Sequence, residues 1–220
     1  MHEEQRRCFI FDCDGVILDS NSIKTEAFRE VAAPYGKEIS DAFVDYHRRN
    51  GGESRYVKID YLREGLLGLT PDAVEAGMLL DQFSAIVVDR LLTCPIADGL
   101  EECRRMVPDS VWLVVSGSDQ SELRAVFDQR GLSSLFDGGI FGSPATKNEI
   151  LSELDAKGVL RKPAVFLGDS RLDHEAAVSA AIDFSFLSCW TEFDGWQDYC
   201  EHHGVRSFPN IEAFFGQSTT

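Results

Sequence analysis

The sequence predicts an α/β protein with a parallel sheet, and three observations support this fold class. Short β-rich runs alternate with helical stretches along most of the chain. The helical stretches carry apolar residues at spacings of three and four. Polar residues gather directly after the expected strands, where ligands bind in open parallel sheets. We therefore expect a parallel sheet flanked by helices.

The expected elements follow one another in a regular order along the chain. Each expected strand is short and rich in β-branched or aromatic residues, and helical stretches separate the later ones. The strands are 8–11 (CFIF), 111–115 (VWLVV), 138–141 (GGIF), 164–167 (AVFL) and 182–187 (IDFSFL), and the helical stretches include 99–107, 118–131, 147–157 and 173–180. Such alternation is typical of βαβ units.

The stretch from about residue 20 to residue 93 contains no convincing buried strand and is expected to be helical. Thr70 and Pro71 are expected to begin a long helix, as its N-cap and its first residue. Asp19 and Ser20 are expected to cap the first helix of the stretch. A helical insert between the first and second strands predicts two parts, a core domain of residues 1–19 and 94–220 and an inserted helical subdomain of residues 20–93.

Composition excludes some functions and constrains others. The net charge of −16 argues against nucleic-acid binding, because phosphate backbones bind basic surfaces. A small phosphorylated ligand would need a local positive pocket or a divalent cation. No apolar run reaches the roughly 18 residues of a spanning helix, and MHEEQRR lacks the apolar stretch of a signal peptide. We expect a cytoplasmic protein with reduced cysteines and no membrane partner, either monomer or dimer.

Four polar motifs follow the first four expected strands. Parallel strands bring their carboxyl ends to one edge of the sheet, so the four motifs should converge there. Their candidate site residues are Asp12 and Asp14 after the first strand, Ser116 and Gly117 after the second, Lys147 after the third, and Asp169 and Asp173 after the fourth. This edge is the predicted functional site.

The motifs have a definite chemistry. Asp12, Asp14 and Asp169 offer the hard oxygen ligands that magnesium prefers. A divalent cation would offset the clustered carboxylates and leave one oxygen free to attack phosphorus. Ser116 can donate a hydrogen bond to a phosphoryl oxygen, and Lys147 can supply positive charge to the transition state.

With these motifs in order and at ordinary spacing, the sequence resembles the haloacid dehalogenase superfamily. The similar branch contains phosphatases and phosphomutases with a helical cap inserted after the first motif, such as phosphoglycolate phosphatase and β-phosphoglucomutase. The motifs are DCDGV, Ser116, Lys147 and GDSRLD, and the resemblance covers nearly the whole chain. It implies a Rossmann-like sheet core with an α-helical cap subdomain.

The resemblance also implies a role for each motif residue. Asp12 would be the nucleophile that forms an aspartyl phosphate, and Asp14 the general acid and base. Asp12, the backbone carbonyl of Asp14, and Asp169 would hold magnesium, while Asp173 would orient a metal-bound water or Lys147. The aspartate at position 14 disfavours dehalogenation. Asn148 stands where relatives often have proline, which leaves the geometry of the Lys147 loop open.

The basic stretch YHRRNGGESRYVK, residues 46–58, is the candidate for substrate recognition in the expected cap. Arginine suits phosphate and carboxylate groups through paired hydrogen bonds. We hypothesise that Arg55, together with Arg49 and Lys58, binds an anionic or hydroxyl-rich leaving group. The alternative is a solvated basic face. Alternatives also stay open for Ser116 as a helix cap and for Lys147 as a solvated lysine at a helix start.

The function that these residues indicate is a magnesium-dependent phosphatase. Its substrate would be a small phosphorylated metabolite, either a phosphosugar or a phosphoglycolate-like acid. The alternatives are a phosphomutase resembling β-phosphoglucomutase, a phosphonatase, and a non-catalytic module that binds a phosphorylated ligand. His202 and His203 are expected in a late loop and are assigned no role.

Overall fold

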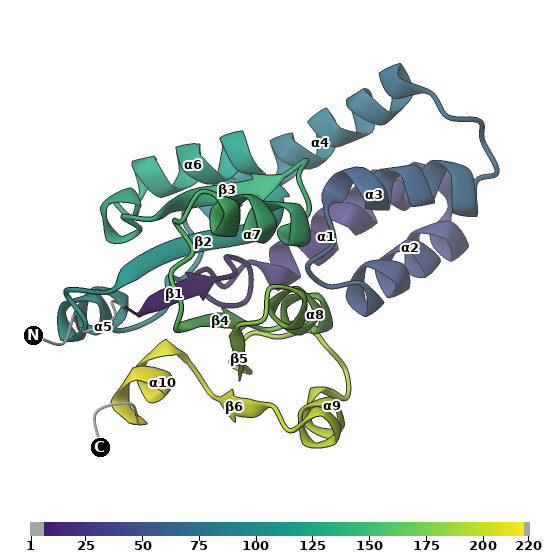
Figure 1. The fold of residues 1–220 in the computed structure, drawn as a ribbon. Coiled ribbons are helices and arrows are strands. Elements are labelled where there is room, and N and C mark those ends of the chain that lie inside the picture. The colour runs from purple at the N-terminus through teal and green to yellow at the C-terminus, as the bar shows by residue number, and fades with distance from the viewer. Residues whose placement is uncertain (1–6, 218–220) are drawn as a thin grey trace, which may run out of the picture.

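The computed structural model describes residues 7–217 and contains one six-stranded sheet in the order β3-β2-β1-β4-β5-β6 (Figure 1). Every neighbouring pair of strands is parallel. The strands are β1 (Cys8–Phe11), β2 (Val111–Asp119), β3 (Gly139–Ser143), β4 (Ala164–Gly168), β5 (Asp183–Leu187) and β6 (Arg206–Phe208). This strand order is that of a Rossmann-like sheet, which confirms the predicted fold class.

The two faces of the sheet bury separate sets of apolar side chains, because successive residues of a strand point to opposite faces. On β1, Ile10 packs with the helices α7 and α8, whereas Phe9 and Phe11 pack on the other face. The helices that flank the sheet are α5 (Leu100–Met106), α6 (Gln120–Gln129), α7 (Lys147–Ala156), α8 (Arg171–Ser179) and α10 (Ile211–Gln217). Both faces of the central strands are therefore covered.

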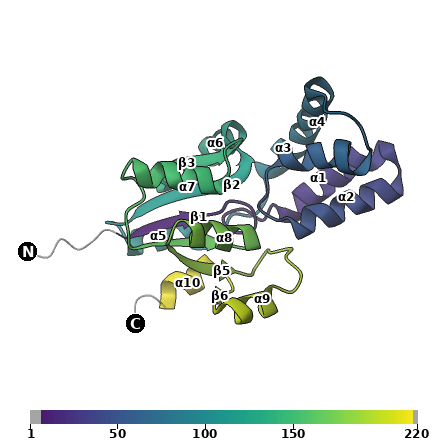
Figure 2. The ribbon, with the colours of Figure 1, turned by 45° about the vertical axis from the view of Figure 1, so that its right-hand side comes forward.

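The helices of residues 20–93 gather at one end of the molecule, beyond the carboxyl ends of the central strands (Figures 1 and 2). They are α1 (Asn21–Ala32), α2 (Lys37–Arg49), α3 (Arg55–Asp60) and α4 (Ala73–Leu91), with a π-helical turn at Tyr61–Leu66. Residues 20–93 contain helices and no strand, as the sequence predicts. The division into a core domain and an inserted subdomain stays a prediction.

Several local expectations were wrong, each for a physical reason. Helix α4 is capped by Asp72 and not by Thr70, because the Asp72 carboxylate accepts hydrogen bonds from the backbone N–H groups of Val74 and Glu75. Strand β6 was missed, since it is three residues long and two of them are exposed. Strand β2 continues past Val115 through an irregular register before it pairs again at its end.

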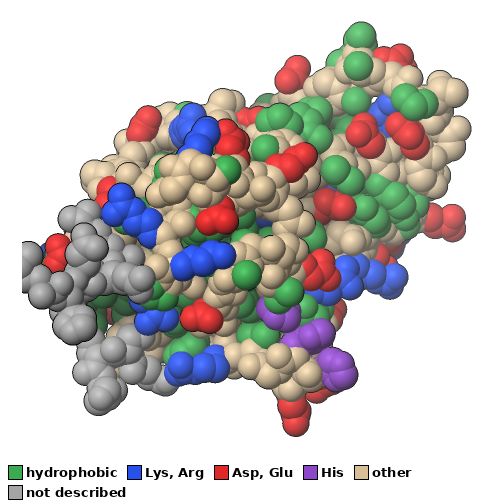
Figure 3. Space-filling model, viewed as in Figure 1, with side chains coloured by type: hydrophobic (Ala, Val, Ile, Leu, Met, Phe, Trp, Pro, Cys, Tyr) green, Lys and Arg blue, Asp and Glu red, His purple; other side chains and the backbone are tan. Residues whose placement is uncertain are grey.

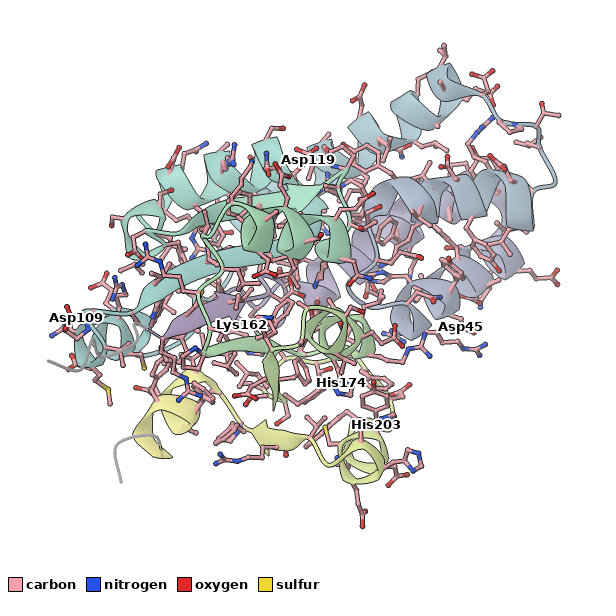
Figure 4. All side chains as sticks on the ribbon, viewed as in Figure 1. Asp45, Asp109, Asp119, Lys162, His174 and His203 are labelled. Carbon is pink, nitrogen blue, oxygen red and sulfur yellow. The ribbon has the colours of Figure 1, made fainter. Side chains whose placement is uncertain are left out.

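His202 and His203 lie in helix α9 (Trp196–His203) and not in a loop. Glycines in the left-handed conformation bound the helix at both ends. The ring of His203 lies 5.4 Å from that of His174 in α8, and Figures 3 and 4 show histidine side chains gathered on this surface. Within residues 7–217, the side chains that lie close enough together to hold a metal ion are Asp12, Asp169 and Asp173, and not these histidines.

No helix within the described residues is both long enough and apolar enough to span a bilayer. The expectation that the chain starts without a signal peptide falls mainly on residues 1–6, which lie outside the described part. All six cysteines are free thiols.

Candidate active site

The two aspartates after β1 reach different partners, although they are two residues apart. The Asp12 Oδ2 atom lies 2.9 Å from Lys147 Nζ, and Asp12 Oδ1 accepts a hydrogen bond from the Cys13 backbone N–H. The Asp14 Oδ2 atom lies 2.5 Å from Lys24 Nζ in helix α1. The first motif thus carries two carboxylates with separate cationic neighbours.

The Asp14 carboxylate sits in a network of three donors. Besides Lys24, the hydroxyl groups of Ser20 and Ser118 donate to it over 2.6 and 2.7 Å. Ser20 holds the N-cap position of α1, but its hydroxyl bonds Asp14 and not a helix N–H, so the expected capping role was wrong. Burial alone raises the pKa of Asp14, but Lys24 and the hydroxyl donors outweigh it and hold that pKa well below its usual range.

A second acidic group joins Asp12 to the end of β4. Donor atoms of Asp12, Asp169 and Asp173 lie within 4.8 Å of one another, and all three side chains are buried. Asn21 donates a hydrogen bond of 2.7 Å to Asp169 Oδ2, which fixes the direction of that carboxylate. Gly15 packs directly against the Asp169 carboxylate, since a Cβ atom at this position would lie 2.2 Å from Asp169 Oδ2.

Asp173 holds Lys147 and the start of α8 in place. One of its oxygens contacts Lys147 Nζ, and the other accepts hydrogen bonds from the hydroxyl and backbone N–H of Ser170 and from the N–H of Asp169. With its oxygens engaged in this way, Asp173 positions Lys147 beside Asp12. The sequence-based interpretation of Asp173 as a residue that orients Lys147 agrees with this geometry, and its role stays a proposal.

The electrostatics of this acidic group suit a divalent cation. Burial, with further contributions from Asp173 and Asp14, raises the pKa of Asp12 to about 7 although Lys147 opposes the shift. Burial, followed by the charges of Asp173 and Asp12, also raises the pKa of Asp169 well above its usual range. Bound magnesium would favour the ionised forms. Asp12 and Asp169 therefore fit a magnesium site, with oxygen donors of the preferred type.

The second motif places Ser118 and not Ser116 on the cavity. Ser116 is fully buried, and its hydroxyl accepts a hydrogen bond from the Ser118 backbone N–H over 3.2 Å. Gly117 and Ser118 line the cavity between the sheet edge and the helices α1–α4. Gly117 also packs against the loop between α2 and α3, because a Cβ atom there would lie 2.3 Å from the carbonyl oxygen of Gly52.

The cavity at this edge is small and lined from both sides. Asp12, Asp14 and Asp169 come from the sheet side, and Arg49 and Lys58 from the helices, which brings most of the predicted site residues together. Lys147 does not line the cavity itself, but it contacts Asp12, which does. The cavity has a volume of about 70 Å³, room for on the order of five water-sized groups.

Arg55 lines the same cavity, but its guanidinium is already paired. It donates two hydrogen bonds to the Glu122 carboxylate of α6, over 2.6 and 2.8 Å, and one to Ser84 of α4. Next to it, the Tyr56 hydroxyl donates to Asp119, which Figure 4 marks near the end of β2. The two contacts join α3 to the sheet side of the molecule. Any substrate anion would compete with Glu122 for Arg55.

We expect Glu122→Gln to destabilise the fold by about 3 kcal/mol, because it leaves a buried guanidinium without its carboxylate. Both side chains are largely buried, at 5% and 11% exposure. Urea titration of the free energy of unfolding measures this effect. The exposed Glu201→Gln is the matched control and should change stability by less than about 0.5 kcal/mol. Equal stabilities of the two variants would show that the Arg55 pair contributes nothing.

Sequence reasoning missed three polar residues of the site, Asn21, Lys24 and Ser118. Asn21 and Lys24 are three residues apart on α1, in register with the apolar residues that face the interior. Polar side chains at buried positions of a helix were the available indication. Ser118 follows Ser116 by two residues in the same strand.

Comparison with known proteins supplies the family context. The family model described as haloacid dehalogenase-like hydrolase matches residues 6–181. A relative from Thermotoga maritima, named phosphorylated carbohydrates phosphatase, is 28% identical over 186 residues, which cover 79% of this chain and 81% of the relative.

Solved structures share the fold over nearly the full length. A predicted phosphatase from Clostridium acetobutylicum has a TM-score of 0.75 at 14% identity and covers 98% of this chain and 99% of its own. The β-phosphoglucomutase from Clostridium difficile has a TM-score of 0.71 at 20% identity and covers 93% of this chain and 91% of its own. At these identities the likeness is one of fold.

Proposed function

Since the chain belongs to the haloacid dehalogenase-like hydrolase family, we propose that it is a magnesium-dependent phosphatase of small phosphorylated metabolites. The observation that carries this proposal is the placement of Asp12. Its carboxylate lies at the end of β1, 2.9 Å from the buried ammonium of Lys147 and within the acidic group of Asp169 and Asp173. The name of the Thermotoga maritima relative supports a phosphorylated carbohydrate or a similar small ester as substrate.

In the first step, an Asp12 oxygen attacks phosphorus and the bond from phosphorus to the leaving oxygen breaks. Asp14 gives its proton to that oxygen, so the leaving group departs as an alcohol and Asp12 carries the phosphoryl group. Lys147 stabilises the negative charge that develops on the phosphoryl oxygens, and Asp173 holds Lys147 in place. Magnesium, held by Asp12, Asp169 and the backbone carbonyl of Asp14, would neutralise phosphoryl and carboxylate charge.

In the second step, water attacks the aspartyl phosphate, Asp14 takes a proton from it, and phosphate leaves with Asp12 restored. A base must be ionised, and the contact with Lys24 keeps Asp14 in that form. The first step needs the protonated form instead. We propose that substrate displaces Asp14 from Lys24, and that Asp14 then takes up a proton from solvent water before it protonates the leaving oxygen.

We propose that residues 20–93 form a cap that encloses the substrate. The close packing of the Gly52 carbonyl against Gly117 supports this, as do the contacts from Arg55 and Tyr56 to the sheet side. A phosphomutase resembling β-phosphoglucomutase is the second candidate. The observation that favours it is that these helices line the cavity opposite the sheet edge, since a shielded aspartyl phosphate would persist until a second sugar hydroxyl attacks it.

Phosphate release from a panel of small esters tests the proposal. The panel contains sugar phosphates, phosphoglycolate, nucleotides and phosphonoacetaldehyde, each with magnesium or with EDTA. We expect phosphate release from at least one small ester, lost in EDTA and restored by added magnesium. Isomerisation of a sugar 1-phosphate without phosphate release would favour the mutase, and turnover of phosphonoacetaldehyde alone would favour a phosphonatase. Turnover that is equal in EDTA would contradict the magnesium site.

A further inference from the structure

Lys58 of helix α3 is a buried cation that lines the cavity. Its side chain is 2% exposed, and its Nζ atom lies 2.8 Å from His47 Nδ1 and 5.5 Å from the centre of the Phe28 ring. The charges of Asp14 and Lys147 both act on the pKa of Lys58, so its ammonium is within electrostatic reach of the catalytic edge. Lys58 thus faces the same enclosed space as Asp12.

Lys58 differs from the other buried cations in having no carboxylate partner. The buried lysine and arginine side chains of residues 7–217 are Lys24, Arg55, Lys58, Arg63 and Lys147. Four of them form ion pairs: Lys24 with Asp14, Arg55 with Glu122, Arg63 with Glu75, and Lys147 with Asp12 and Asp173. For Lys58, no carboxylate oxygen in this part of the chain is within ion-pair distance. A buried charge without a partner is costly to the fold.

The neighbours of Lys58 do not neutralise it. Burial and the nearby charges of Lys58 and Lys24 hold the pKa of His47 well below its usual range, so the imidazole is neutral and accepts a hydrogen bond from Lys58 through Nδ1. The acid whose charge acts most on Lys58 is Glu53, which accepts a hydrogen bond from Tyr46 instead. An ammonium has three hydrogens, so Lys58 keeps donors for a ligand.

We propose that Lys58, oriented by His47, binds a second anionic group on the leaving part of the substrate. The inference rests on the phosphatase function proposed above and narrows its substrate class. The ester would be a compact phosphorylated acid or a bisphosphate, with one anion at Asp12 and Lys147 and the other at Lys58. Lys58 lines the cavity from the side of the helices, and Asp12, which contacts Lys147, lines it from the side of the sheet.

Specificity is the direct test. The kcat/KM values of wild type and Lys58→Met are measured for 2-phosphoglycolate, fructose 1,6-bisphosphate and the uncharged-leaving-group ester glycerol 1-phosphate. We expect the ratio of an anionic to the neutral ester to fall by about 10- to 100-fold in the variant, as for loss of one charge-assisted hydrogen bond. The ester whose ratio falls distinguishes a carboxylate from a second phosphate. Lys37→Met removes an 88% exposed lysine and is the matched control.

Stability separates a binding role from a structural one. Burial is the main cause that lowers the pKa of Lys58 to about 7. The positive charges of Lys24 and Lys147 also lower this pKa, whereas the negative charges of Glu53 and Asp14 raise it. Because the pKa of Lys58 is lower in the folded than in the unfolded chain, its charge destabilises the fold at pH values below the folded pKa. This destabilisation disappears as pH rises toward the pKa of the unfolded chain. Lys58→Met should therefore raise Tm at pH 6 and raise it less at pH 9. If Lys58 only stabilised the fold, Lys58→Met would lower Tm at both pH values.

A binding measurement that needs no turnover distinguishes failure of the anion subsite from failure of the phosphatase function. 2-Phosphoglycolate should raise Tm of the magnesium-loaded wild type, and Lys58→Met should lose most of this shift while Lys37→Met keeps it. A retained shift in Lys58→Met, or an equal fall in kcat/KM for all three esters, would overturn the anion subsite. A lost shift in a protein that hydrolyses neither these three esters nor any ester of the wider panel would keep the subsite and reject the phosphatase.

Discussion

Asp12→Asn is expected to abolish phosphate release, with kcat lower by at least about 10⁴-fold, because loss of a catalytic nucleophile leaves only binding and charge stabilisation. The asparagine amide is a poor nucleophile and cannot carry the phosphoryl group. It also removes one of the oxygens that would hold magnesium. Steady-state phosphate release over a range of magnesium concentrations measures the loss, and added magnesium should not restore activity.

The substitution should leave the fold intact. Burial disfavours the ionised form of Asp12, so the neutral amide costs little there, and Lys147 keeps its contact with Asp173. Asp183→Asn, the same change at the exposed start of β5, is the matched control and should keep wild-type activity. A folded Asp12→Asn with more than about one hundredth of wild-type kcat would contradict the nucleophile assignment.

Asp14→Asn is expected to lower kcat by about 10²- to 10⁴-fold, the usual size of a general acid-base contribution. The amide oxygen can still accept hydrogen bonds from Ser118 and Lys24, and the amide NH2 group can donate to the Ser20 hydroxyl, so the local geometry should persist. The loss should depend on the leaving group. An ester with a good leaving group, such as p-nitrophenyl phosphate, needs no acid in the first step, although the second step still needs a base.

Rapid mixing of Asp14→Asn with p-nitrophenyl phosphate should therefore give a burst of nitrophenol, followed by slow turnover. Asp19→Asn serves as the control, since Asp19 lies in the same loop but outside the cavity. Equal losses for good and poor leaving groups, without a burst, would show that Asp14 acts through folding or magnesium binding and not through proton transfer.

The sequence predicted the sheet and the convergence of its motifs well, because both depend on short-range patterns. Short apolar runs marked the buried strands. The helical stretches between these runs indicated that the strands are parallel. Once the strands were placed, the proximity of Asp12, Asp169 and Lys147 followed from the geometry of a parallel sheet. Their convergence at one edge needed only a parallel sheet and the strand ends, whereas the strand order and the distances come from the structure.

The partners of the cations could not be predicted in this way, because they join residues far apart in the chain. Arg55 was selected for its charge, but Glu122 on α6 accepts its donors. Lys24 is only ten residues from Asp14, but its contact depends on the path of the loop that joins β1 to α1. Lys58 became distinctive only when the other buried cations of residues 7–217 proved to have carboxylate partners. Sequence composition shows charge, whereas pairing depends on the fold.

Trapping the phosphorylated chain tests the central claim most directly. The magnesium-loaded protein is mixed with a turned-over ester, quenched in acid within milliseconds, and digested for mass spectrometry. We predict that the peptide containing Asp12 gains the mass of one phosphoryl group, and that the gain is absent in Asp12→Asn and in EDTA. A protein that releases phosphate while Asp12 stays unmodified at every quench time, or a phosphoryl group found on another residue, would contradict the mechanism.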